Sequence, residues 1–128
     1  MKIAVLGYGT VGSGVVEVLD VNQKLIASRA KEKIEVKYVL DLRDFPGDKI
    51  QEKIVHDYEI ILNDPEIGIV VEVMGGVEPA NTFVRKALEA GKSVVTSNKA
   101  LVAKYGSALL KTAREKNVNF LFEASVGG

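Results

Sequence analysis

The strongest constraint on the fold of this chain is a short apolar run that ends in closely spaced glycines. Residues 2–6 (Lys-Ile-Ala-Val-Leu) are followed at once by Gly7, Gly9 and Gly12, in the spacing G-x-G-x-x-G. The apolar run predicts a buried parallel strand, and apolar residues beyond the first glycines recur at helical spacing over 10–29. The chain is therefore predicted to begin with a strand, a tight glycine turn and a helix.

Strand and helix patterns alternate along the rest of the chain. Further strands are predicted at 34–40, 54–55, 69–74, 93–96 and 119–123. Helices are predicted at 57–62 after an Asp57 cap, at 79–90, from an Asn98 cap to an interruption at Gly106, and from a Ser107 cap to Lys116. This alternation predicts one α/β domain over 1–128: a Rossmann-type, doubly wound, mostly parallel sheet with helices on both faces.

In a parallel sheet the carboxyl ends of all strands meet at one edge, where ligands bind. Most of the glycines and polar residues that follow predicted strands are therefore expected to lie together at this edge of the sheet. They are residues 7–12, Asp41, Gly75 and Gly76, residues 96–99, and residues 123–128.

The glycine motif has the context that a dinucleotide-binding loop requires, since it follows a strand and opens a helix. Gly7 permits the tight turn, Gly9 lets a pyrophosphate approach the backbone, and Gly12 lets the helix pack closely on the strand. The predicted cofactor-binding residues of this loop are Gly7, Tyr8, Gly9, Thr10, Val11 and Gly12. The alternative is an incidental glycine turn.

An acidic residue, Asp41, stands at the end of the second predicted strand, where a carboxylate accepts hydrogen bonds from the adenosine ribose. Arg43 lies two residues further on and could bind a 2′-phosphate. The cofactor is therefore left as NAD or NADP, and a solvated turn without a ligand is the alternative.

Five other residues can carry chemistry or structure. Gly76, with Gly75 before it, would let a flat or bulky ligand approach closely, and Lys99 could polarise a carbonyl or hold a carboxylate, or else point to water. Glu72 is interpreted as a hydrogen-bonded structural carboxylate, and His56 as a surface residue.

Composition excludes several classes of protein. Seventeen basic and seventeen acidic residues balance, which gives no reason to expect nucleic acid or an anionic membrane as a partner. The chain has no cysteine, and its apolar runs fall short of the ~20 residues of a membrane helix. We expect a cytoplasmic protein with a small-molecule ligand.

Four segments taken together resemble homoserine dehydrogenase. They are 7–15, 70–79, 91–101 and 122–128, which read GYGTVGSGV, VVEVMGGVEP, GKSVVTSNKAL and FEASVGG. The resemblance covers the whole chain and implies the family's N-terminal nicotinamide-dinucleotide domain. It also implies a dimerisation and substrate domain beyond residue 128, and a homodimeric full-length protein.

The resemblance implies reversible, NAD(P)-dependent interconversion of L-homoserine and L-aspartate 4-semialdehyde, on the route to threonine and methionine. Met74, Gly75 and Gly76 would line the nicotinamide and ribose side, while Ser97 and the catalytic Lys99 would face cofactor and substrate. The segment with Glu123, Val126 and Gly128 resembles the family's monovalent-cation site, which would be complete only in a longer protein.

The resemblance also implies that a second lysine, used in proton transfer, lies in the other domain, so this chain alone is expected to bind cofactor without turnover. Two alternatives remain. One is the cofactor domain of another two-domain NAD(P) oxidoreductase, acting on a sugar or a different amino-acid aldehyde. The other is a dinucleotide-sensing module without chemistry.

Overall fold

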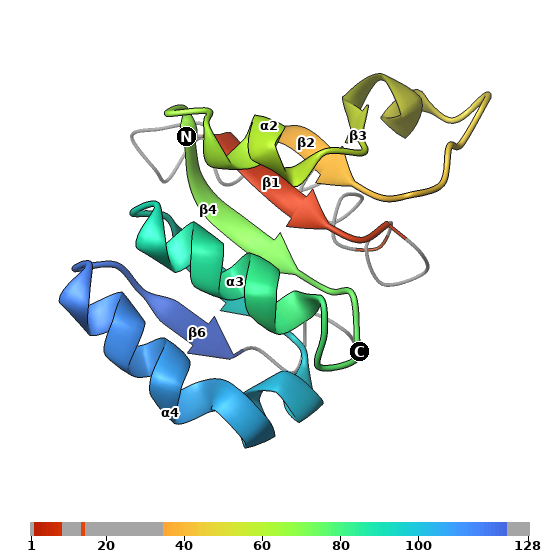
Figure 1. The fold of residues 1–128 in the computed structure, drawn as a ribbon. Helices are drawn as coiled ribbons and strands as arrows, with labels where there is room; N and C mark the ends of the chain where they lie inside the picture. Colours follow the sequence, from red (N-terminus) through yellow and green to blue (C-terminus); the bar gives the residue numbers. More distant parts are fainter. Residues whose placement is uncertain (1, 9–13, 15–34, 123–128) are drawn as a thin grey trace.

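The computed structural model describes residues 2–8, 14 and 35–122. In this part of the chain six parallel strands form one sheet in the order β3-β2-β1-β4-β5-β6 (Figure 1). The strands are β1 (Lys2–Leu6), β2 (Glu35–Leu40), β3 (Ile54–Val55), β4 (Ile67–Glu72), β5 (Ser93–Thr96) and β6 (Phe120–Phe122). The strand order reverses direction between β1 and β4, as in doubly wound nucleotide-binding folds, and confirms the predicted fold class.

Apolar side chains cover both faces of this sheet. Helices α2 (Tyr58–Leu62), α3 (Ala80–Glu89) and α4 (Lys99–Glu115) lie along one face (Figure 1), where Ile61, Val84 and Leu109 join the larger core. The 3-10 helix η1 (Lys49–Lys53) contributes Ile50 to a second cluster on the opposite face, with Val5 and Val39. The helix predicted over 10–29 lies outside the described residues except for Gly14, which is helical.

In the second predicted strand, Ile34, Val36, Tyr38 and Leu40 stand at every second position, which predicts that they share one face of the sheet, and this is wrong in the middle of the strand. Ile3 pairs with Val36 and Ala4 pairs with Tyr38, so that Lys37 is an extra residue in β2. An extra residue shifts the two-residue period by one position. Val36 and Val39 therefore face the same apolar cluster, although they stand three positions apart in the sequence.

The N-caps predicted at Asp57 and Asn98 are confirmed. An Asp57 side-chain oxygen accepts a hydrogen bond of 3.0 Å from Glu59 N, and Asn98 Oδ1 accepts one of 3.1 Å from Leu101 N. These bonds satisfy amides that have no partner within the first helical turn. The fourth strand differs from its prediction by two residues, because it begins at Ile67 and ends at Glu72.

The predicted break at Gly106, with a new cap at Ser107, is wrong, because α4 continues unbroken from Lys99 to Glu115. Glycine costs about 1 kcal/mol in a helix relative to alanine. Here the flanking turns are anchored in the core by Leu101, Leu109 and Ala113. Gly106 is itself buried, and a Cβ there would lie 3.2 Å from Val102 Cγ1, so close packing accounts for the glycine.

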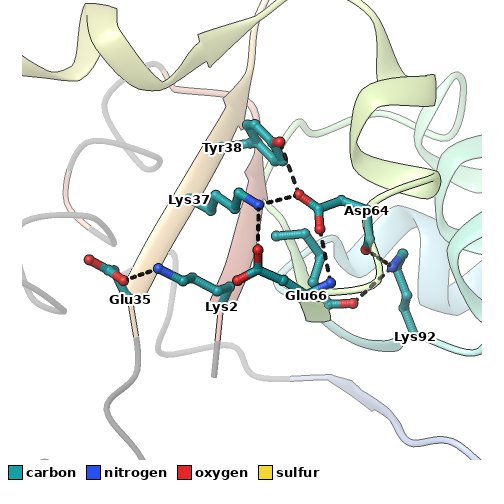
Figure 2. A network of polar contacts seen from close by, with 8 residues as sticks. Lys2, Glu35, Lys37, Tyr38, Asp64, Glu66 and Lys92 are labelled. Atoms are coloured by element: carbon teal, nitrogen blue, oxygen red, sulfur yellow. Dashed lines mark hydrogen bonds and ion pairs between the residues drawn. The ribbon is translucent and has the colours of Figure 1, made fainter.

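The amino-terminal edge of the sheet carries a polar network that holds the strands together (Figure 2). Asp64 Oδ2 accepts hydrogen bonds from Lys37 Nζ at 2.5 Å and from Tyr38 Oη at 2.9 Å. The buried ammonium of Lys92 donates to the carbonyl oxygens of Asp64 and Ile67, each at 2.8 Å. These side chains are committed to structure at the edge opposite to the carboxyl ends of the strands.

Candidate functional site

Gly7 brings three strand ends together at the carboxyl edge of the sheet. Its N–H donates a 2.8 Å hydrogen bond to Leu40 O at the end of β2. Its φ of 95° is in the region that favours glycine, and a Cβ at this position would lie 3.2 Å from Met74 Cγ, beyond β4. Backbone conformation and close packing therefore both account for this first glycine of the motif.

Asp41 is fixed to the glycine loop by a backbone contact. The N–H of Tyr8 donates a 3.0 Å hydrogen bond to Asp41 Oδ2, which joins the end of β1 to the end of β2. The Asp41 side chain is only 9% exposed, so its carboxylate is held in one place at the edge of the sheet. The motif and the acidic residue, predicted separately from the sequence, are in contact.

Arg43 occupies the same carboxylate from the solvent side. Its Nε donates to Asp41 Oδ1 at 3.1 Å, its second guanidinium nitrogen donates to Oδ2 at 3.0 Å, and its backbone N–H donates to Oδ1 at 2.9 Å. The guanidinium of Arg43, with these backbone N–H groups, lowers the pKa of Asp41 to about 2. A carboxylate has about four acceptor positions. With the bond from Tyr8 all four are used, so ribose hydroxyls can bind only where Arg43 moves away.

The loop after β2 is held from two further sides. The ring of Tyr8 meets that of Phe45 edge-on at 4.7 Å between centroids, and Tyr8 Oη donates to Asp48 Oδ2 at 3.2 Å. His56, which follows β3, contacts Asp41 O through Nδ1 at 2.7 Å and Asp44 Oδ1 through Nε2 at 2.9 Å. His56 is exposed, as expected, but its two contacts to this loop had no signal in the sequence.

A buried polar network connects the loop after β4 to the turn after β5. Glu72, which has no exposed surface, accepts hydrogen bonds from Met74 N at 2.7 Å and from Thr96 Oγ1 at 2.6 Å. Asn98 Nδ2 donates to Gly76 O at 2.6 Å, and Asn98 N donates to Thr96 Oγ1 at 3.0 Å. Glu72 is thus hydrogen-bonded as interpreted, while the bridging role of Thr96 and Asn98 was missed.

The remaining predicted residues lie along the same edge. Gly75 and Gly76 have φ of 77° and 74°, and among the described residues, apart from its chain neighbours, no atom lies within 4 Å of a Cβ placed on Gly75, which leaves space for a ligand there. Ser97 N donates to Glu72 O at 3.2 Å. Lys99 is exposed as the first residue of α4, and no ion pair of its ammonium exists in the described part of the chain.

Several predicted residues lie outside the described ranges: Gly9, Thr10, Val11 and Gly12 of the glycine motif, and Glu123, Val126 and Gly128 of the expected cation site. Among the described residues there is no cluster of three or more histidine, cysteine, aspartate or glutamate side chains that could hold a metal ion. No helix in the same ranges is long and apolar enough to cross a membrane.

The architecture and the motif positions agree with a known family. The family model described as "Homoserine dehydrogenase, NAD binding domain" matches residues 7–123. The chain belongs to this family. Its matched segment includes every predicted cofactor-binding residue, from Gly7 at the end of β1 to Lys99 at the start of α4.

Curated homoserine dehydrogenases contain a similar domain within a longer chain. The homoserine dehydrogenase of Synechocystis sp. is 44% identical over 131 residues, and that of Pseudomonas aeruginosa is 43% identical over 129 residues. In both comparisons all of this chain is covered, and it spans 30% of the relative. The chain therefore corresponds to the NAD-binding domain of these longer oxidoreductases.

Solved structures agree with the fold. A crystal structure of S. aureus homoserine dehydrogenase at pH 8.5 has a TM-score of 0.88 and 40% identity, and covers 98% of this chain and 32% of its own. A hyperthermophilic archaeal homoserine dehydrogenase in complex with NADPH has a TM-score of 0.72 and 25% identity, with 97% of this chain and 44% of that chain covered.

Proposed function

We propose that this chain binds NAD(P) across the carboxyl edge of β1, β2 and β4, as the cofactor domain of a homoserine dehydrogenase. The observation that carries the proposal is the hydrogen bond from Tyr8 N to Asp41 Oδ2. It holds Asp41, which follows β2, beside Tyr8 at the edge where parallel sheets bind dinucleotides.

Both NAD and NADP are compatible with the Asp41–Arg43 pair. The Arg43 side chain is 62% exposed, so it can leave Asp41 at little cost. When Arg43 leaves, Asp41 gains free acceptor positions for ribose hydroxyls. When the ribose carries a 2′-phosphate, the Arg43 guanidinium, which lies beside Asp41, can bind it. We therefore infer dual cofactor use, with Arg43 favouring NADP.

In this proposal the nicotinamide half of the cofactor binds beside the polar network of Glu72, Thr96 and Asn98. When bound, the nicotinamide dinucleotide supplies or accepts the hydride. Glu72 and Asn98 hold Met74 and Gly76 through hydrogen bonds, so that the open surface at Gly75 keeps its shape. Ser97 and Lys99 stand at the positive N-terminal end of α4, whose first turn carries no acidic residue, and can attract an anionic group of cofactor or substrate.

The activity of a full-length protein rests on the family relationship. We infer that a protein of the relatives' length carrying this domain interconverts L-homoserine and L-aspartate 4-semialdehyde, with Lys99 as a catalytic residue. The homodimer and a monovalent-cation loop at Glu123, Val126 and Gly128 belong to the same proposal. The 128-residue chain is expected to bind cofactor without turning over homoserine.

The test is a titration of the 128-residue chain with NADH and with NADPH, followed by calorimetry or by nicotinamide fluorescence. Saturable binding of both is expected. Arg43→Ala should weaken NADPH binding about tenfold or more, since a charge-assisted contact is lost, and should change NADH binding little. Arg114→Ala is the matched control, because Arg114 lies in the last turn of α4, near the opposite edge. Absence of saturable binding of either cofactor would overturn the proposal.

A further inference from the structure

The imidazole of His56 has two hydrogen-bond partners, and both of them only accept. Nδ1 lies 2.7 Å from Asp41 O, a backbone carbonyl, and Nε2 lies 2.9 Å from Asp44 Oδ1, a carboxylate oxygen. A neutral imidazole carries one N–H and can satisfy only one of them, whereas the protonated ring donates to both. The geometry around His56 therefore fits the imidazolium form.

Arg43 lies in a loop that contacts the His56 ring at two points, one before Arg43 and one after it. The bond to Asp41 O lies two residues before Arg43, and the bond to Asp44 lies one residue after it. Gln51 Nε2, on η1, donates to the same Asp44 Oδ1 at 3.1 Å. Hydrogen bonds therefore connect segment 41–44, which follows β2, to His56 after β3 and to Gln51 in η1.

Charged groups around the ring favour its protonated form. The hydrogen bond to Asp41 O, then Asp44 and the charge of Asp41, raise the pKa of His56 above its ordinary value of 6.5. The next residue in the sequence, Asp57, accepts a hydrogen bond from Glu59 N as the N-cap of α2. The charged side chains of η1 make no hydrogen bond or ion pair with the ring within the described ranges: Lys49, Glu52 and Lys53.

We propose that His56 is a positioning residue for cofactor choice: protonated, it holds the 41–44 turn and neutralises Asp44, so that a 2′-phosphorylated dinucleotide binds beside Arg43. The proposal rests on the proposed cofactor function. Deprotonation removes one positive charge from this turn and leaves Asp44 uncompensated near a phosphate that carries about two negative charges. A cofactor without the 2′-phosphate does not experience that repulsion. NADPH binding should therefore weaken more than NADH binding as the pH rises.

The experiment measures dissociation constants of the 128-residue chain for NADPH and NADH between about pH 6.5 and 8.5, above the phosphate's own titration near ~6. The ratio of the NADPH constant to the NADH constant should rise about three- to tenfold across this range, as a nearby charge is lost. In His56→Gln, which keeps a donor and cannot titrate, the ratio should stay flat. In His56→Lys it should stay near its low-pH value.

A second measurement does not depend on any variant. His56 is the only histidine of the chain, so its ring resonances can be followed by NMR without ambiguity. Its pKa should rise when NADPH binds and should rise much less when NADH binds, because only the first places a dianion near the ring. Equal pKa values in the two complexes would overturn the proposal even if His56→Gln failed to fold.

The outcomes separate the two proposals. If neither cofactor binds at any pH, the proposed cofactor function fails. If both bind and wild type and His56→Gln show the same dependence of the ratio on pH, the cofactor function stands and the role of His56 is wrong. Since both proteins receive the same ligand, titration of the 2′-phosphate cancels in this comparison.

Discussion

The hydroxyl of Thr96 donates a 2.6 Å hydrogen bond to Glu72 Oε1, and neither side chain has any exposed surface. The two residues are neighbours across the β4–β5 pair, since Thr96 is the register partner of Glu72. Thr96 Oγ1 also accepts from Asn98 N. One hydroxyl thus satisfies a buried carboxylate and orients the turn that leads to Lys99.

Thr96→Val keeps the shape of the side chain and removes the hydroxyl. Glu72 Oε1 and Asn98 N each lose a partner inside the protein, and an unsatisfied buried group costs about 1–3 kcal/mol, more if it is charged. We expect the free energy of unfolding in urea to fall by at least ~2 kcal/mol. Thr112→Val removes a hydroxyl whose one hydrogen bond among the described residues is to Ala108 O in its own helix, and it should change the free energy of unfolding by less than ~0.5 kcal/mol. Equal costs would contradict the bridging role.

Gly7→Ala tests whether the first motif glycine is required by conformation and by packing. Gly47 has a similar φ, 87° against 95°, but in the described part of the chain, beyond its two neighbours, no atom lies within 4 Å of its missing Cβ. Both alanine variants carry the strain of a positive φ, about 1–2 kcal/mol. Gly7→Ala should cost about 1 kcal/mol more, because its Cβ overlaps Met74, and should also weaken cofactor binding. The measurements are urea unfolding and NADPH titration, and no difference between the variants would exclude the packing argument.

Asp64→Asn tests the network of Figure 2 by its dependence on pH. Hydrogen bonding from Lys37 lowers the pKa of Asp64 from 3.8 to about 2. A carboxylate with a lowered pKa stabilises the fold above its unfolded pKa and loses this contribution as the pH falls through the folded value. The difference in Tm between wild type and variant should therefore be largest above about pH 5 and should narrow toward about pH 2.

The comparison for this network is Tyr38→Phe. It removes the neutral hydroxyl bond to Asp64 and leaves the Lys37 ion pair in place. Its decrease in Tm should also narrow as the pH falls toward about 2, but by less than that of Asp64→Asn, because the Tyr38 hydroxyl lowers the pKa of Asp64 less than Lys37 does. If the difference in Tm between wild type and Asp64→Asn stays constant between about pH 5 and 2, the ion pair adds nothing to stability.

Lys99→Met, in a protein of the relatives' full length, tests the catalytic assignment. Loss of the ammonium should lower kcat by about 10²–10⁴, the range for a positioned acid–base group. Because a cation at the start of a helix is unfavourable, the same variant should gain a few tenths of a kcal/mol in stability. Lys104→Met, an exposed lysine further along α4, is the control and should leave kcat unchanged. Full activity of Lys99→Met would contradict the catalytic role of Lys99.

Local signals in the sequence predicted local structure well. Asp57 and Asn98 were identified as caps because the residues that cap and those that are capped lie within four positions of each other. Predictions were wrong where distant packing decides. The break at Gly106 did not occur because α4 is anchored on both sides in the core, and the alternation of β2 changes at Lys37 because β1 sets its register.

By itself, the sequence determined the order of the described strands and the residues among them that gather at one edge of the sheet. It did not determine that Tyr8 N binds Asp41, that Arg43 uses both oxygens of that carboxylate, or that His56 fastens the same loop. Periodicity depends on neighbours a few positions apart, whereas Tyr8 and Asp41 are separated by 33 positions. Only the pairing of β1 with β2 brings them together, and this pairing decides which charges a bound cofactor meets.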